Sequence, residues 1–133
     1  MANYTKKNLR EVEDSAVKFG FAPDMSARFA SNDLGLEKSG ISLQGLAPNK
    51  RGKFGHRHET QEELYVIVSG GGRVKLDDDI VELAQWDALR VPPEVARQFE
   101  AGPDGLEMLA FGAPRDSESA ARDAQMLGDF WSD

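Results

Sequence analysis

Hydrophobic and polar residues alternate along the middle of the chain, from about residue 40 to residue 112. Ile41-Ser42-Leu43-Gln44 alternates apolar and polar side chains, and Glu63 to Val68 is rich in β-branched and aromatic residues. Because successive side chains of a strand point to opposite faces, this alternation predicts half-buried strands. The same pattern predicts further strands at residues 53–58, 73–76, 80–83, 87–91, 95–101 and 106–111.

Gly, Pro and Asp residues stand between these predicted strands. Tight turns are predicted at Ser69-Gly70-Gly71-Gly72, at Asp77-Asp78-Asp79 and at Gly102-Pro103-Asp104-Gly105, and Pro92-Pro93 ends the strand before it. Eight short strands at regular spacing, separated by such turns, favour an all-β barrel or sandwich.

The two ends of the chain have a different character. Residues 1–20 are polar and could form a short helix or an irregular arm, and a strand is possible through residues 28–31. Residues 117–127 contain good helix formers, with Asp116 or Ser117 as a possible N-cap and Gly128 as a stop. Phe130 and Trp131 follow, and so much apolar area is expected to dock on the barrel or on a partner subunit.

Composition limits the function classes. The chain has 133 residues, enough for one domain, and we divide it into an N-terminal arm with the first strands (1–39), the barrel (40–112) and a C-terminal helix and tail (113–133). No cysteine is present, which excludes disulfides and thiolate ligands and favours a cytoplasmic location. We expect no signal peptide and no membrane span, since no apolar run approaches about 20 residues. The net charge of −7 argues against nucleic-acid binding.

The candidate chemistry lies at the two histidines of the chain, His56 and His58. They stand two apart in a predicted strand and therefore point the same way, and Glu63 and Tyr65 share one face of the next strand. If these strands are neighbours, two imidazoles and a carboxylate converge, which suits a divalent transition metal with open positions for a ligand. A shifted register would place Glu62 there instead of Glu63.

The spacing of these residues, closed by Gly70, resembles the first motif of the cupin superfamily, and residues 40–112 resemble the cupin barrel. The resemblance implies a jelly-roll β-barrel and a homodimer. The second cupin motif, aligned at Pro92, is degenerate: Trp86 and Glu94 stand at its glycine positions, and Arg97 stands where a further histidine ligand is expected.

Arg97 leaves two arrangements open, because a guanidinium cannot ligate a cation. It could pair bidentately with Glu63, so that a metal is weakly held or absent. Alternatively, it could turn aside to bind an anionic ligand, while His56, His58 and Glu63 hold one divalent ion such as Fe, Mn, Ni or Zn.

Two function classes follow, and the sequence does not choose between them. The first is an enzyme acting on a small polar or anionic molecule in the barrel. With metal, the resemblance implies a dioxygenase or an isomerase with Arg97 as anion anchor. Without metal, a histidine could act as general base and Tyr65 as acid, although a core aromatic is the commoner role of a strand tyrosine and the one favoured for Tyr65. The second class is a non-catalytic module that binds or senses a small molecule.

Overall fold

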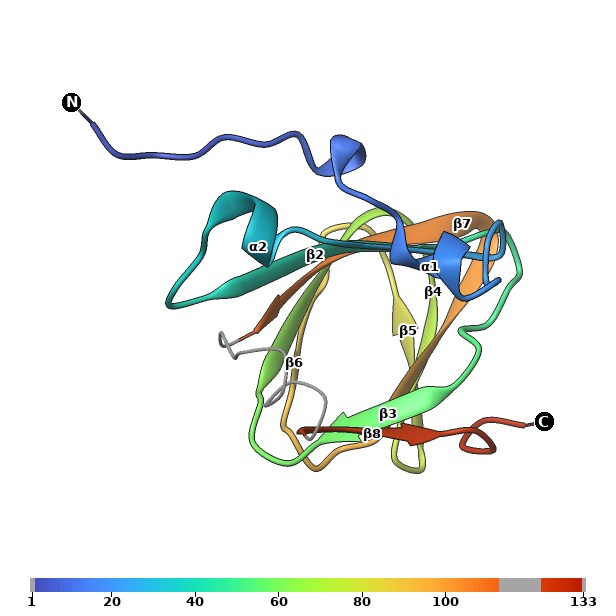
Figure 1. Cartoon of the computed structure of the whole chain (residues 1–133). Coiled ribbons are helices and arrows are strands. Elements are labelled where there is room, and N and C mark those ends of the chain that lie inside the picture. The colour runs from blue at the N-terminus through green and yellow to red at the C-terminus, as the bar shows by residue number, and fades with distance from the viewer. Residues whose placement is uncertain (1, 113–122, 133) are drawn as a thin grey trace.

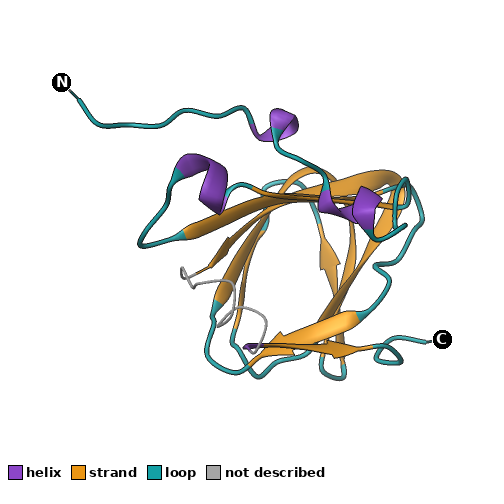
Figure 2. Ribbon diagram, viewed as in Figure 1, coloured by secondary structure: helices purple, strands orange, loops and turns teal. Residues whose placement is uncertain are grey.

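The computed structural model describes residues 2–112 and 123–132, about half of which form a sheet curled into a barrel (Figures 1 and 2). Three short helical segments precede or interrupt the first strands. These are η1 (Leu9–Glu11), α1 (Ser15–Lys18) and α2 (Ser31–Leu34). The strands are β1 (Met25–Phe29), β2 (Gly40–Leu46), β3 (Gly55–His58), β4 (Glu63–Leu76), β5 (Asp79–Leu83), β6 (Ala88–Val91), β7 (Arg97–Gly112) and β8 (Ala124–Leu127).

All strand pairs are antiparallel, and two long strands organise them. The order β1-β2-β7-β3-β8 forms one path, while β4 pairs with β5, β6 and β7. Figure 1 shows β2 and the β3–β8 pair on opposite sides of the barrel. The predicted all-β, jelly-roll barrel is therefore confirmed.

The predicted turns at residues 69–72 and 102–105 are wrong, because β4 and β7 each run through them as one strand. The register between these strands shifts there instead: Gly70 pairs with Leu106, whereas Gly72 pairs with Ala101. Gly70 and Gly105 lie at this register shift and have positive φ angles, 69° and 78°. Glycine supplies the backbone freedom that a β-bulge needs, and the bulge bends the strands without reversing them.

Gly70→Ala is expected to lower the free energy of unfolding by more than about 1 kcal/mol, because alanine is strained at positive φ. A methyl group built on Gly70 would also overlap the backbone carbonyl of Gly105 on β7. Gly128→Ala is the matched control, since a methyl group placed on Gly128 would meet open space. Urea denaturation of both variants checks this, and equal stability would mean that the register shift does not depend on this glycine.

The hydrophobic core lies inside the barrel, on the inward faces predicted by alternation. Ile67, Val74 and Val91 are fully buried, and the Tyr65 ring packs on Phe99 with ring centroids 4.9 Å apart. Tyr65 is thus a core aromatic whose hydroxyl reaches the site described below.

The C-terminal segment differs from its prediction. Residues 124–127 form the strand β8, not a helix, and pair with β3 in the register His58↔Ala124 to Gly55↔Leu127. The rest of the predicted helix, residues 117–122, lies outside the described residues. Local helix propensity is outweighed at 124–127 because β3 offers a free edge whose backbone groups β8 satisfies.

The aromatic tail docks on the chain's own barrel. Trp131 is 5% exposed, and its ring lies under the guanidinium groups of Arg51 and Arg73, at 4.1 and 5.2 Å. Arg51 also donates to the Trp131 carbonyl (2.9 Å) and forms an ion pair with Glu100 (2.8 Å). These contacts hold the end of the chain beside β8.

Within the described ranges, none of the helices has the length and apolar character needed to cross a bilayer.

Candidate functional site

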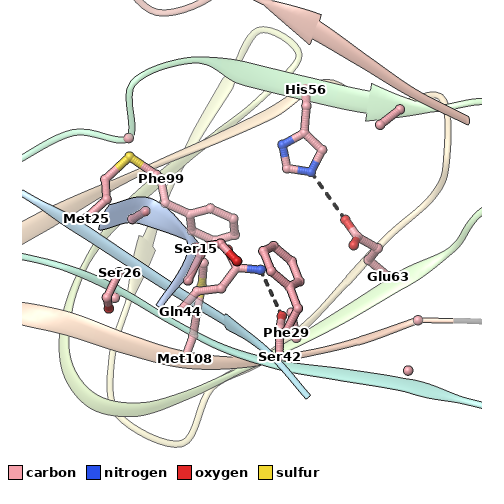
Figure 3. A pocket seen from close by; sticks show the side chains of 18 of the residues that line it. Ser15, Met25, Ser26, Phe29, Ser42, Gln44, His56, Glu63, Phe99 and Met108 are labelled. Carbon is pink, nitrogen blue, oxygen red and sulfur yellow. Dashed lines mark hydrogen bonds and ion pairs between the residues drawn. The ribbon is translucent and has the colours of Figure 1, made fainter. Parts of the chain in front are cut away.

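His56, His58 and Glu63 converge as the sequence indicates. The two imidazoles come from the same face of β3, with ring centroids 5.2 Å apart, and Glu63 begins β4. Glu63 Oε1 lies 3.4 Å from His56 Nε2 and 3.2 Å from His58 Nε2. Figure 3 shows the His56 ring directed at the Glu63 carboxylate, on one side of the cavity. Glu62 does not replace Glu63, because it points to the surface beside Arg90, 3.8 Å away.

The same carboxylate oxygen of Glu63 also accepts hydrogen bonds from Tyr65 and from Arg97 (2.8 Å). Burial alone raises the pKa of Glu63, but its contacts with His56 and His58 and the hydrogen bond from Tyr65 outweigh this effect and hold the pKa well below its usual range. Burial and the nearby Glu63 charge raise the pKa of Tyr65 well above its ordinary value. Glu63 is therefore ionised at neutral pH, and Tyr65 keeps its proton.

Arg97 is fully buried and lies at the edge of this cluster. One of its terminal nitrogens donates to Glu63, and the other donates to the backbone carbonyl of Pro92 (2.7 Å). The expected pairing with Glu63 is thus made through one nitrogen and is not bidentate. The Arg97 Nε atom is buried and has no hydrogen-bond partner among the described residues.

Asp123, which the sequence did not indicate, orients His58. Its carboxylate lies 2.9 Å from His58 Nδ1 and accepts bonds from the backbone N–H and hydroxyl of Thr60, at 2.9 and 2.5 Å. Asp123 is 65 residues from His58 and lies next to a segment with helical propensity, so no local pattern could reveal the contact. A carboxylate on Nδ1 keeps the proton there, which leaves the lone pair on Nε2.

This orientation creates an acceptor pair that needs a cation. With the His58 proton on Nδ1, the Nε2 lone pair faces the ionised Glu63 Oε1 at 3.2 Å. Two acceptors at that distance repel unless a proton or a metal ion lies between them. The ligand atoms of His56, His58 and Glu63 all lie within 4.8 Å of one another.

The donor set fits a divalent transition metal with three protein ligands. Two ligand atoms bound at about 2.1 Å to one ion, at angles between octahedral and tetrahedral, lie about 3.0–3.4 Å apart. The distances from Glu63 Oε1 to His56 Nε2 (3.4 Å) and to His58 Nε2 (3.2 Å) fall in this range. Two imidazoles, one oriented by a carboxylate, and one carboxylate are ligands that such ions accept. His56, His58 and Glu63 could therefore hold a metal ion, and Arg97 adds no ligand.

Asp123→Asn is expected to weaken zinc binding by about 10–100-fold, because the amide no longer fixes the Nδ1 proton of His58. Asp123 is 6% exposed, so the near-isosteric amide keeps the packing. Competition titration against a zinc chelator dye measures the affinity, and the thermal midpoint of the metal-free variant reports its folding. A folded variant that binds zinc as tightly as the parent would contradict this orienting role.

A cavity of about 770 Å³ opens above the cluster (Figure 3). Its walls come from β1, β2, β3, β7 and β8 and from the segment after α1. The ionisable side chains among its described lining are His56, His58, Glu63 and Arg97. The chemistry of the site is therefore gathered at one end of an otherwise neutral chamber.

Sequence comparison finds little. No protein-family model matches the chain. The uncharacterized protein MJ1618 of Methanocaldococcus jannaschii is 36% identical over 45 residues, which is 34% of this chain. The match covers 36% of that protein, so the chain spans about a third of the length of its curated relative.

Comparison with solved structures is more informative. A cupin protein (BF4112) from Bacteroides fragilis is 26% identical, with a TM-score of 0.69 over 88% of this chain and 89% of that chain. A protein assigned as a sugar phosphate isomerase from Acidithiobacillus ferrooxidans is 25% identical, with a TM-score of 0.61 over 69% and 60% of the two chains.

A third solved structure, a salicylate 1,2-dioxygenase from Pseudaminobacter salicylatoxidans, shares the fold at 15% identity, with a TM-score of 0.69 over 86% of this chain and 34% of that chain. At this low identity, the comparison shows that the two proteins share a fold and nothing further. Three observations point to one family: the barrel, the His-x-His motif beside Glu63, and the match to the Bacteroides protein. This chain belongs to the cupin superfamily.

Proposed function

We propose that this protein is an enzyme that binds a small molecule in the barrel, at a divalent transition metal held by His56, His58 and Glu63. The observation that carries the proposal is the contact at 3.2 Å between His58 Nε2 and Glu63, with Asp123 2.9 Å from His58 Nδ1. A neutral His58 with its proton on Nδ1, the tautomer that Asp123 favours, presents a lone pair to Glu63. Iron, manganese, nickel or zinc bound there would act as a Lewis acid toward an oxygen of the ligand. The reaction class that we propose is a dioxygenation or an isomerisation, since a salicylate 1,2-dioxygenase and a protein assigned as a sugar phosphate isomerase share this fold.

For Tyr65 and Arg97 we propose that they act through Glu63. Both donate to Glu63 Oε1, so they fix the direction of its carboxylate. To anchor an anionic ligand, as the sequence led us to expect, Arg97 would have to release Glu63 or the Pro92 carbonyl, since only Nε is without a partner in the described structure. A positioning role requires no such change.

The second candidate is a non-catalytic binding module without metal. The buried contact between Arg97 and Glu63 favours it, because the guanidinium already neutralises the carboxylate. A proton shared between His58 and Glu63 would then satisfy the acceptor pair. The homodimer and the cytoplasmic location expected from the sequence stay predictions.

Metal titration of two variants tests the first proposal. Arg97→His is expected to raise zinc affinity at least tenfold over the parent, because it removes a fixed positive charge and supplies a third imidazole. Arg57→His is the matched control, since Arg57 is an exposed residue of β3 that bonds Gln125 on the outside. Isothermal titration with zinc gives the affinity and the stoichiometry. No gain for folded Arg97→His would place Arg97 away from the metal position.

A further inference from the structure

The cavity has two chemically different regions. His56 and Glu63 occupy one end, whereas Met25, Phe29, Phe99 and Met108 form much of the wall that faces them (Figure 3). Phe99 and Met108 are buried and belong to the core, so this part of the wall is fixed in place. Most of the surface of a ligand that reaches the candidate metal position would therefore contact apolar and aromatic side chains.

The cavity is poorly suited to a strongly anionic ligand. Its described lining contains no lysine, and the one arginine there, Arg97, already faces Glu63 at 2.8 Å. Apart from the proposed metal ion, a phosphate group that entered would lose its hydration without gaining a free cationic side chain from these residues. The small polar or anionic molecule expected from the sequence is for this reason the weaker match.

Three large apolar side chains of the lining are also exposed. Phe19, Phe29 and Met126 line the cavity from three separate segments and are 69%, 57% and 59% exposed. Large apolar side chains gathered on one surface usually mark a binding site. Aromatic rings such as Phe29 and Phe99 favour flat partners, which they can stack against or contact edge-on.

Uncharged polar side chains also line the cavity, and one hydrogen-bonded pair of them lies between the two regions. Gln44 of β2 projects into the cavity between Phe29 and Phe99, and its amide nitrogen donates to Ser42 (3.0 Å) (Figure 3). The amide carries a second N–H and a carbonyl oxygen, so it can bond one polar substituent of a ligand. A few placed polar groups in an apolar chamber are typical of small-molecule sites of this size.

We infer that the ligand is a flat, mainly apolar, ring-containing molecule with an oxygen substituent directed at His56 and Glu63. The inference rests on the proposed function, because it takes the His-His-Glu end as the place where the ligand reacts or binds. It adds the class of ligand: a hydroxylated aromatic compound and not a phosphorylated sugar.

Titration of zinc-loaded full-length protein with 2-naphthol and with glucose 6-phosphate tests the inference. The naphthol is expected to bind at least tenfold more tightly than the sugar phosphate. Phe29→Ser is expected to weaken naphthol binding at least tenfold, and Ile80→Ser, an exposed strand residue outside the cavity lining, to leave it unchanged. Because Phe29 is 57% exposed, its replacement should not prevent folding.

Three results would overturn the inference: tighter binding of glucose 6-phosphate, naphthol binding that Phe29→Ser leaves unchanged, or no naphthol binding at all. Each is distinguishable from failure of the proposed function, because zinc stoichiometry is measured on the same samples. One zinc per chain that is lost in His56→Ala would keep the metal site while rejecting this class of ligand.

Discussion

Replacing Glu63 with glutamine is expected to lower the free energy of unfolding by about 3–5 kcal/mol, the usual effect of removing one partner of a buried ion pair. The Arg97 side chain is 0% exposed, and among the described residues it forms an ion pair with Glu63, at 2.8 Å. The variant leaves a permanent charge buried without a counter-charge. Urea denaturation of metal-free protein measures the loss without any contribution from bound metal.

The double variant Glu63→Gln/Arg97→Met separates charge from packing. Methionine is close to arginine in length and removes the unpaired cation, so at least half of the lost stability should return. If Glu63→Gln is as stable as the parent, the guanidinium has a partner other than Glu63. If the double variant is no more stable than the single one, packing and not charge accounts for the loss.

Trp131→Ala is expected to lower the free energy of unfolding by about 3–5 kcal/mol, as for other buried aromatic side chains. The indole is 5% exposed and lies against Arg51 and Arg73. The chain has two tryptophans, and the other, Trp86, is 69% exposed. Trp86→Ala is therefore the matched control, with an expected change within about 0.5 kcal/mol.

Each of these variants retains a single tryptophan, so fluorescence-monitored denaturation reports on one known position. Because the docked tail follows β8 and Asp123, Trp131→Ala should also weaken zinc binding, whereas Trp86→Ala should not. Equal stability of the two variants would contradict docking of the tail on the barrel.

The parts of the site that follow from alternation could be predicted from the sequence. His56 and His58 share a face because a strand repeats every two residues, and Glu63 and Tyr65 share a face for the same reason. The proline alignment brought Arg97 to the same cluster, and the structure places its guanidinium on Glu63. Alternation along a strand and spacing between motif residues are local properties, so they can be read from a single sequence.

The parts that depend on distant pairing could not be predicted. Asp123 reaches His58 because β8 pairs with β3, and nothing in the segment 124–127 distinguishes this edge strand from a helix. The glycines at 70–72 are compatible with a turn or with a bulge, and the pairing with the neighbouring strand β7 decides between them. The apolar wall of the cavity likewise combines residues of strands that are far apart in the chain.

Binding of one metal ion by His56, His58 and Glu63 is the proposal on which the others depend. Anomalous diffraction from zinc-soaked crystals tests it most directly. We predict one anomalous peak about 2.1 Å from the Nε2 atoms of both histidines and from a Glu63 oxygen, with Asp123 still bonded to His58 Nδ1. A site without a peak, with Arg97 and a protonated His58 remaining on Glu63, would contradict it.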